Sequence, residues 1–516
     1  MIVEFEQEGK ALKHVWSNCV GAGRANEGLR ADWQEQLKVV QKECGFRYLR
    51  FHGLLHDDMH VYKEEDGKVV LNFQYADKLF DKLLEIGIRP FVEFGFMPGG
   101  LASTEATQFW WKGRIAPPKD YEKWRALITG LVKHWIYRYG EAEVKQWYFE
   151  IWNEPDLPVF WDGTKSQYFE LYRTAVLAIK GICPELRVGG PATSNFVPDD
   201  RFAGEREDTS RHLTFQVEDI NTLEWRGVWI QDFLDFCEKE KLPVDFISTH
   251  PYPTDFALDG YGEYRGLTRY KDALKDDVQW LKQVIADSAY PDVEIHLTEW
   301  SSSPSSRDYS HDYLPEAVNI LRNNLQCKGF DSLSYWVFTD IFEELGAGPA
   351  PFHGGFGLLS LCSAKKPAFH AYRMLNQLGD VELASGEGYM FTRKGERLSV
   401  ILYHYPESYM DSIPMSMYPD QSRAQECQEW KEERVFEFEV RRLAPGDMYV
   451  LRELCAEDLA VVKWNEMGAP TEMTREQEEL LRRQGEVLIE RPLIVDKDGV
   501  LRIRWEAKAW SVAEIH

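Results

Sequence analysis

Two glutamates, Glu154 and Glu299, each stand where a strand-like run of residues stops. The run 147–152 is aromatic and apolar, which is typical of a parallel strand covered on both faces. Pro155 cannot donate a hydrogen bond to a neighbouring strand, so pairing ends beside Asn153 and Glu154. A carboxyl group flanked by aromatic surface is poorly solvated, which favours its neutral form. Glu154 could therefore hold a proton near neutral pH and donate it to a leaving oxygen.

Glu299 supplies the second carboxyl of the predicted pair. Residues 293–300 alternate apolar and polar side chains and end before a serine-rich turn that contains Pro304. Two carboxyls on the strand ends of one sheet can face each other across a substrate. Glycoside hydrolysis needs that arrangement, because one carboxyl protonates the leaving oxygen while the other attacks the anomeric carbon or activates water.

Eight strand-like runs alternate with helix-like runs between residues 17 and 338. Strict alternation implies a parallel sheet with right-handed crossovers, and eight units predict a closed (β/α)8 or TIM barrel of the α/β class. Chemistry in such a barrel gathers at the carboxyl ends of the strands. The two glutamates end strands four and seven, on opposite sides of the mouth. Polar and unusual residues at the predicted strand ends are His52, Glu93, Asn153, Glu154, His250, Tyr252, Glu299 and Trp336.

Short alternating strands between turn residues begin near residue 378 and predict an accessory β-sandwich. A long segment, residues 196–226, follows strand five and is open to interpretation as a lid, a subunit contact or a mobile flap. The expected division is an N-terminal strand over 1–12 that joins the sandwich, a catalytic barrel over 13–375, and a sandwich over 376–516 with a short helical segment near 474–484.

The letters Trp-Asn-Glu occur twice in the chain. Trp464, Asn465 and Glu466 repeat the last part of the first motif, but Met467 follows them instead of proline. We interpret this second copy as a turn before a helix and expect no chemistry from it.

The charge and cysteine pattern exclude several classes of function. The chain has 85 acidic and 60 basic residues, a formal net charge of −25, which argues against nucleic acid or an anionic membrane surface as partner. The eight cysteines form no C-x-x-C pair and no zinc-ligand spacing, so we expect no metal and no cofactor. The sequence shows no signal-peptide pattern and no run of about 18 apolar residues. We therefore expect a cytoplasmic enzyme without a membrane span.

An ordered set of motifs resembles the family 39 glycoside hydrolases, in particular their bacterial β-xylosidases. One of these motifs is Phe149-Glu-Ile-Trp-Asn-Glu-Pro155. Asn-Glu-Pro recurs in several barrel glycosidase families, but the ordered set is specific and spans the whole predicted barrel. The motifs lie at residues 19–24, 52–55, 85–98, 117–124, 149–155, 188–191, 334–336 and 352–358.

The resemblance implies a retaining mechanism, with Glu154 as general acid/base and Glu299 as nucleophile. It also implies that Asn153 binds the sugar 2-hydroxyl, and that the protein is a homo-oligomer, since family xylosidases are often tetramers. Glu344 stands beside Glu343, so which of the two faces the sugar stays open. The positions that match the family's sugar pocket are His52, His250, Tyr252, Trp336, Glu343 and His353.

Two departures from the family pattern lie near the mouth. Residues 298–302 read Thr-Glu-Trp-Ser-Ser where family xylosidases usually have Thr-Glu-Tyr-Asn-Thr, and the segment 196–226 is longer than in those enzymes. The leading hypothesis is an exo-acting β-xylosidase that releases xylose from xylo-oligosaccharides. The alternatives are the same mechanism on another sugar (an α-L-arabinosidase, a β-galactosidase or a uronic-acid-specific glycosidase), a non-catalytic carbohydrate-binding protein, and a metal-dependent barrel enzyme.

Overall fold

The computed structural model describes residues 1–194, 229–258, 264–268, 271–409 and 421–516. The long segment 196–226 lies outside the described residues. None of the helices in these described ranges combines the length and the apolar composition of a membrane-spanning helix. All eight cysteines are free, and six of them, Cys19, Cys44 and Cys237 among them, are buried.

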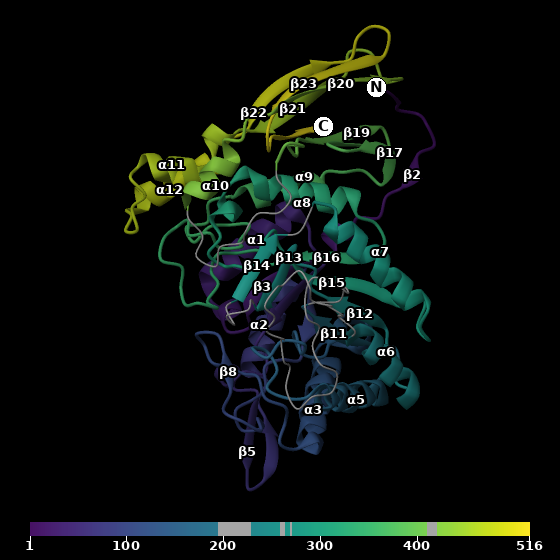
Figure 1. The fold of residues 1–516 in the computed structure, drawn as a ribbon, viewed down its shortest axis with the longest axis vertical. Helices are drawn as coiled ribbons and strands as arrows, with labels where there is room; N and C mark the ends of the chain where they lie inside the picture. Colours follow the sequence, from purple (N-terminus) through teal and green to yellow (C-terminus); the bar gives the residue numbers. More distant parts are fainter. Residues whose placement is uncertain (195–228, 259–263, 269–270, 410–420) are drawn as a thin grey trace.

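Eight parallel strands close into a barrel, as predicted. They follow one another around it in chain order, and Tyr335 pairs with Val20 to complete the ring. The barrel lies in the middle of the molecule in Figure 1. Its strands are β3 (Cys19–Arg24), β4 (Tyr48–His52), β7 (Arg89–Glu93), β10 (Tyr148–Glu150), β11 (Arg187–Thr193), β12 (Phe246–Thr249), β15 (Glu294–Trp300) and β16 (Ser332–Tyr335).

Helices separate consecutive barrel strands and cover the outside of the barrel. Capping side chains define their starts: Asp120 accepts from two backbone N–H groups of the first turn of α3, and Thr164 forms a capping box with Gln167 at α5. The helices are α1 (Ala31–Cys44), α2 (Gln74–Ile86), α3 (Tyr121–Tyr139), α4 (Glu141–Val144), α5 (Lys165–Ile182), α6 (Trp229–Glu240), α7 (Ala273–Ala286), α8 (Leu314–Gln326) and α9 (Pro367–Asn376).

Side chains of β10 are buried on both faces of the strand. Trp147 and Phe149 pack against Trp135 of α3, with ring centroids 5.9 and 6.1 Å apart. Tyr148 faces the other way and forms an apolar layer inside the barrel with Phe91, Phe246 and Cys19. Glu150 follows Tyr148 two residues later, so it points into the barrel one layer nearer the mouth. The inside of the barrel therefore changes from apolar to charged toward the carboxyl ends of its strands.

Two further sheets lie at one end of the molecule, together with both chain termini (Figure 1). Their facing sides share one apolar core that includes Val3, Phe391, Phe438 and Trp505. One sheet has the order β1 (Ile2–Glu4), β20 (Glu433–Arg441), β23 (Val500–Lys508). The other has the order β2 (Lys10–Ala11), β17 (Val381–Gly386), β18 (Tyr389–Lys394), β19 (Arg397–Tyr403), β24 (Val512–Ile515), β21 (Met448–Leu454), β22 (Ile489–Ile494).

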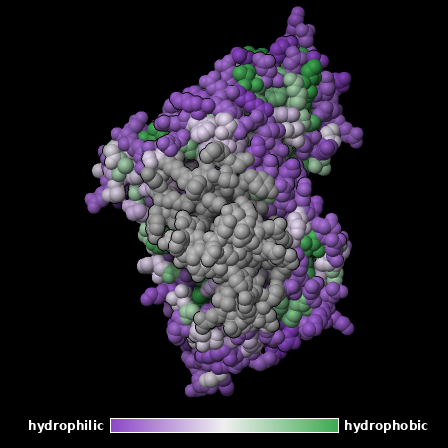
Figure 2. Space-filling model, viewed as in Figure 1, coloured by the Kyte–Doolittle hydropathy of each residue, from purple (hydrophilic) through white to green (hydrophobic). Residues whose placement is uncertain are grey.

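The N-terminal residues pair with these accessory sheets, since Ile2 lies opposite Glu439 and Ala11 opposite Val381. The domain boundaries at residues 12 and 375 stay a prediction. Helices α10 (Gln421–Gln428), α11 (Ala460–Glu466) and α12 (Arg475–Gln484) lie beside the sheets, and α12 coincides with the expected charged helix. The coloured surface in Figure 2 is mostly hydrophilic, with hydrophobic patches at the sandwich end and along the edges of the barrel part.

Three small hairpins extend from the barrel: β5 (Tyr62–Glu65) with β6 (Lys68–Leu71), β8 (Thr107–Gln108) with β9 (Gly113–Arg114), and β13 (Thr254–Leu258) with β14 (Tyr264–Thr268). The second Trp-Asn-Glu sequence lies inside α11, so its interpretation as a turn was wrong. Trp464 is buried and anchors this helix with an indole N–H donated to the Pro470 carbonyl at 2.9 Å.

Candidate active site

Glu154 lies in a sharp turn just beyond β10. Trp152 and Glu154 have φ angles of 76° and 44°, in the left-handed region that side-chain-bearing residues occupy when the surroundings hold them there. The backbone N–H of Glu154 donates to the Ala192 carbonyl at 2.8 Å, and the Trp152 indole donates to the Phe160 carbonyl at 3.0 Å. The turn leaves Glu154 at the mouth of the barrel and only 6% exposed.

Glu299 lies near the end of β15, where the pairing with β16 shifts register between Leu297 and Trp300. Such irregularities redirect side chains and are frequent beside active sites. Arg50 donates to Glu299 Oε1 at 2.6 Å, and the Tyr252 hydroxyl donates to Oε2 at 3.2 Å. The side chain is therefore held from two sides inside the barrel.

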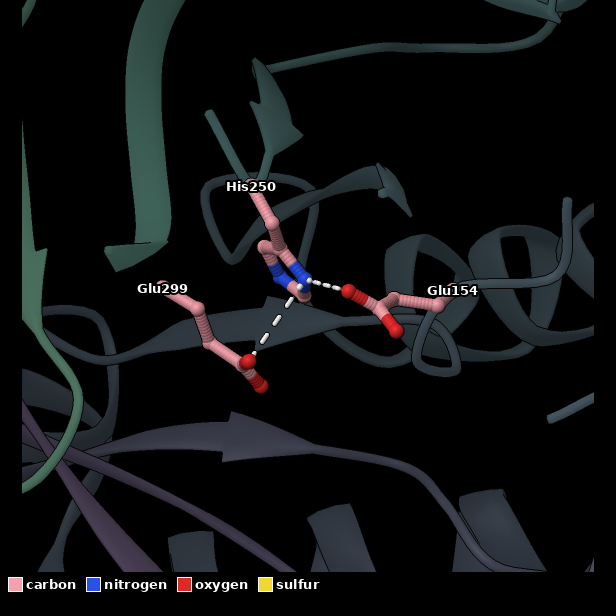
Figure 3. A group of neighbouring side chains, drawn as sticks. All are labelled: Glu154, His250 and Glu299. Atoms are coloured by element: carbon pink, nitrogen blue, oxygen red, sulfur yellow. Dashed lines mark hydrogen bonds and ion pairs between the residues drawn. The ribbon is translucent and has the colours of Figure 1, made fainter. Parts of the chain in front are cut away.

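The two glutamates face each other beside His250 (Figure 3). His250 Nδ1 lies 2.8 Å from Glu154 Oε1 and 3.7 Å from Glu299 Oε2. One carboxylate oxygen of each glutamate and one nitrogen of His250 all lie within 4.8 Å of one another. Retaining glycosidases hold their carboxyls about 5–5.5 Å apart, and inverting enzymes about 6.5–9.5 Å apart. The separation here is of the retaining kind.

Arg50 connects the charged groups under the mouth. It is fully buried and lies 2.5 Å from Glu150, 2.6 Å from Glu299 and 3.2 Å from Glu93. It also donates to Asn153 Oδ1 at 2.9 Å, which sets the direction of that amide. Sequence reasoning missed Arg50. The available signal was its place two residues before His52 in β4, because alternate residues of a strand point to the same face.

The surroundings of the two glutamates give them different pKa values. Burial raises the pKa of Glu154 well above its ordinary value, and the nearby carboxylates of Glu299 and Asp156 raise it further. Burial also raises the pKa of Glu299, but Arg50 and His52 lower it. The pKa of both carboxyls is raised, and the surroundings of Glu154 favour its protonated form more strongly than those of Glu299.

Most of the predicted pocket residues lie next to this pair. His52 Nε2 is 3.4 Å from Glu299 Oε1, while its Nδ1 bonds to Glu93. The Trp336 ring lies beside His52, with centroids 4.7 Å apart. His250 contacts Glu154 more closely than Glu299.

His353 lies in a different set of contacts. Its Nδ1 donates to the Ala350 carbonyl at 2.9 Å, and its described contacts do not reach Glu154 or Glu299. Buried Asp340, Asp312 and Lys366 interact electrostatically with its ring. Lys366 forms ion pairs with Asp312 at 2.6 Å and with Asp340 at 3.2 Å. This buried group supports the loop that carries His353.

Glu343 and Glu344 point to different surroundings. Glu343 forms ion pairs with Arg24 at 3.1 Å and Arg30 at 3.2 Å, which use both of its oxygens. The Glu344 carboxyl interacts with Glu299 and accepts a hydrogen bond from Trp336, and burial raises its pKa well above the ordinary value. Of the two, Glu344 is the one whose carboxyl lies next to Glu299. Sequence reasoning had left this choice open.

Glu154, His250 and Glu299 are also residue types that bind metals, and the chain folds them together although the sequence showed no ligand spacing. Their arrangement has another explanation, because the His250 contacts with both glutamates account for it. Arg50 adds a permanent positive charge 2.6 Å from Glu299. That charge opposes a divalent cation at the same carboxylate.

The chain matches the family model described as Glycosyl hydrolases family 39 over residues 1–206 and 226–502. It is 40% identical to a β-xylosidase of Geobacillus stearothermophilus over 415 residues. This aligned region covers 78% of this chain and 76% of that enzyme. A family 39 enzyme from Xanthomonas axonopodis pv. citri has a similar structure, with a TM-score of 0.85 and 31% identity over 100% of this chain and 96% of that one. A monomeric β-xylosidase from Caulobacter crescentus CB15 matches with a TM-score of 0.83 and 32% identity over 100% and 98%. This chain therefore belongs to glycosyl hydrolase family 39.

Proposed function

We propose that this glycoside hydrolase is an exo-acting β-xylosidase, which releases xylose from xylo-oligosaccharides by double displacement with retention. The observation that carries the mechanism is the short separation of the Glu154 and Glu299 carboxyls, within 4.8 Å at their facing oxygens. The choice of xylose is supported by the β-xylosidase from Geobacillus stearothermophilus, whose sequence matches most of this chain.

In the first step, Glu299 attacks the anomeric carbon of the terminal sugar. Arg50 and Tyr252 both donate to its carboxylate, which keeps it ionised and directs the attacking oxygen. Glu154 gives its proton to the glycosidic oxygen as the bond to the anomeric carbon breaks. The step releases the shortened oligosaccharide and leaves a covalent bond between xylose and Glu299.

In the second step, Glu154 is ionised and takes a proton from a water molecule. That water attacks the anomeric carbon, the bond to Glu299 breaks, and xylose leaves with its original configuration. The return of the proton to Glu154 is favoured because burial and nearby negative charges raise the pKa of this carboxyl.

The remaining pocket residues have roles in binding. Asn153, held by Arg50, binds the 2-hydroxyl, where a hydrogen bond strengthens as positive charge develops at the anomeric carbon. The further residues that we propose to bind the sugar are His52, His250, Tyr252, Trp336 and Glu344. We also propose that the loop that carries His353 contributes to the pocket.

The test is a panel of nitrophenyl glycosides together with xylobiose. We expect release from the β-xyloside and from xylobiose, slower release from the α-L-arabinoside and β-galactoside, and β-xylose as the first anomer seen by NMR. Absence of release from the β-xyloside would contradict the proposal that the substrate is a xyloside. Release of α-xylose as the first product would contradict the proposed retaining mechanism. We expect activity to survive a chelator, and a loss that added metal restores would favour the metal-dependent alternative.

Assembly and location stay predictions. We propose a homo-oligomer on the family resemblance, whereas the Caulobacter crescentus relative is a monomeric β-xylosidase. Light scattering at several protein concentrations distinguishes a tetramer from a monomer. For the cytoplasmic location we expect the protein in the cytoplasmic fraction of lysed cells, and its recovery from the culture medium would contradict that expectation.

A further inference from the structure

Glu150 is a buried carboxylate that the proposed reaction does not use. It lies on β10 four residues before Glu154, and its exposed fraction is 0%. Arg50 Nε donates to its Oε2 at 2.5 Å, and Thr298 Oγ1 donates to its Oε1 at 2.9 Å. A carboxylate that binds a guanidinium accepts hydrogen bonds and has none to give. The hydrogen between Thr298 and Glu150 therefore comes from the threonine.

That donation determines what Thr298 can offer to its other neighbour. A threonine hydroxyl has one hydrogen and two acceptor positions. Since Glu150 takes the hydrogen, the contact of 3.1 Å between Thr298 Oγ1 and His250 Nε2 requires an N–H on the histidine. The network thus assigns a hydrogen to His250 Nε2.

The other nitrogen of His250 is then bare. Burial keeps the pKa of His250 well below its ordinary value, and its electrostatic interactions with Arg50 and His52 lower that pKa further. A neutral imidazole carries one N–H, which is already used toward Thr298. The contact of 2.8 Å between His250 Nδ1 and Glu154 Oε1 therefore needs its hydrogen from the Glu154 carboxyl group.

We propose that Thr298, oriented by Glu150, is a positioning residue that holds His250 in the tautomer with a bare Nδ1 and so keeps the catalytic proton on Glu154 in the free enzyme. The proposal rests on the role of Glu154 as general acid. When substrate binds, rotation of the Glu154 carboxyl brings the proton from His250 to the glycosidic oxygen. After transfer, the carboxylate faces a nitrogen lone pair, which makes it a stronger base toward the water of the second step.

The opposite tautomer would reverse this effect. A hydrogen on His250 Nδ1 would donate to ionised Glu154 and lower the pKa of that carboxyl. The remaining charges around the two side chains do not depend on the tautomer. Those that face Glu154 are Glu299, Asp156, Glu344 and Arg50, and those that face His250 are Arg50, His52 and Glu299.

The test is the pH profile of kcat/KM for xylobiose in Thr298→Val, which has the shape of threonine without its hydroxyl. The His250 N–H loses its acceptor at Nε2, so the hydrogen moves to Nδ1. We expect the alkaline limb, which reports Glu154 in the free enzyme, to shift down by about one pH unit, equivalent to the reversal of one hydrogen bond. Thr298→Ser restores the hydroxyl and should restore the limb.

Thr249→Val is the matched control. Thr249 is equally buried on β12, and its hydroxyl donates at 2.9 Å to the Thr193 carbonyl, which also accepts the His250 backbone N–H, and not to the His250 ring. We expect its alkaline limb to stay in place. An unmoved or raised limb in folded Thr298→Val, or a failure of serine to restore it, would overturn the proposal.

Neutron diffraction of the deuterium-exchanged wild-type protein gives a test that needs no variant. We expect deuterium on His250 Nε2 and between His250 Nδ1 and Glu154, bonded to the carboxyl oxygen. Deuterium bonded to His250 Nδ1 would refute the assignment. Failure of Glu154 as general acid would appear separately, as a Glu154→Ala variant that keeps its activity on xylobiose.

Discussion

The two halves of the carboxyl pair have the same residue type and nearly the same burial, 6% for Glu154 and 5% for Glu299, but different neighbours. The Glu299 side is bound by the cation of Arg50 and by the Tyr252 hydroxyl. The Glu154 side meets neutral His250 and nearby carboxylates. The difference teaches that burial raises the pKa of both groups, while the neighbouring charges make this rise larger for Glu154 and smaller for Glu299.

Removal of the Glu299 carboxylate should have the largest effect on activity. We expect Glu299→Ala to lower kcat by about 10⁴-fold or more on every substrate, because no covalent intermediate can form. Added azide should yield the inverted xylosyl azide and no retained product, as seen by NMR.

Glu294→Ala is the control for that variant, since Glu294 lies at the other end of the same strand, where it bonds to Tyr148 and His296. It should keep most of the activity. Near-normal turnover of xylobiose by Glu299→Ala would mean that the role of nucleophile lies elsewhere.

Loss of the protonated side should depend on the leaving group. We expect Glu154→Ala to lower kcat/KM for xylobiose by about 10²–10⁴-fold, the usual value of general acid catalysis. The same parameter for dinitrophenyl β-xyloside should change little, because that leaving group needs no proton. Equal losses on both substrates would show that the variant has damaged the site as a whole.

Replacement of Arg50 should make the pKa values of Glu154 and Glu299 more alike. We expect Arg50→Lys to raise the pKa of Glu299, so the acidic limb of kcat/KM should move up by about one pH unit. The alkaline limb should move less, since Glu154 has His250 as its nearest partner.

Arg138→Lys is the matched control for Arg50, because Arg138 also forms a two-point ion pair, with Asp81 on the surface. Its pH profile should match the wild type. An unchanged acidic limb in Arg50→Lys would show that this arginine does not control the pKa of Glu299.

The smallest expected effects compare Glu344 with Glu343. Glu344→Gln should raise KM for xylobiose by about tenfold, the loss expected for one hydrogen bond. Glu343→Gln should instead leave Arg24 and Arg30 without their shared partner and lower the thermal midpoint with little change in KM. A larger change of KM in Glu343→Gln than in Glu344→Gln would indicate that Glu343 is the residue that binds the sugar.

The strands of the barrel and both of its glutamates could be predicted because they depend on local patterns. The aromatic run that ends at Asn153 and Pro155 specifies a buried strand and its end, wherever the rest of the chain lies. Local letters can also mislead: Trp464, Asn465 and Glu466 repeat the motif inside an accessory helix. The sequence pattern did not indicate Thr298 or Glu150 as partners of the site, because a threonine or a glutamate inside a strand has no distinctive spacing.

The sequence by itself determined which residues end the barrel strands and therefore which side chains reach its mouth. Only the tertiary structure decided which of them touch. Arg50, Glu150 and Glu299 come from three strands, 100 and 249 positions separate the arginine from its two partners, and barrel closure brings the three together. Hydrogen bonds depend on distances of a few tenths of an ångström, which follow from packing across the whole barrel and not from the order of neighbouring residues.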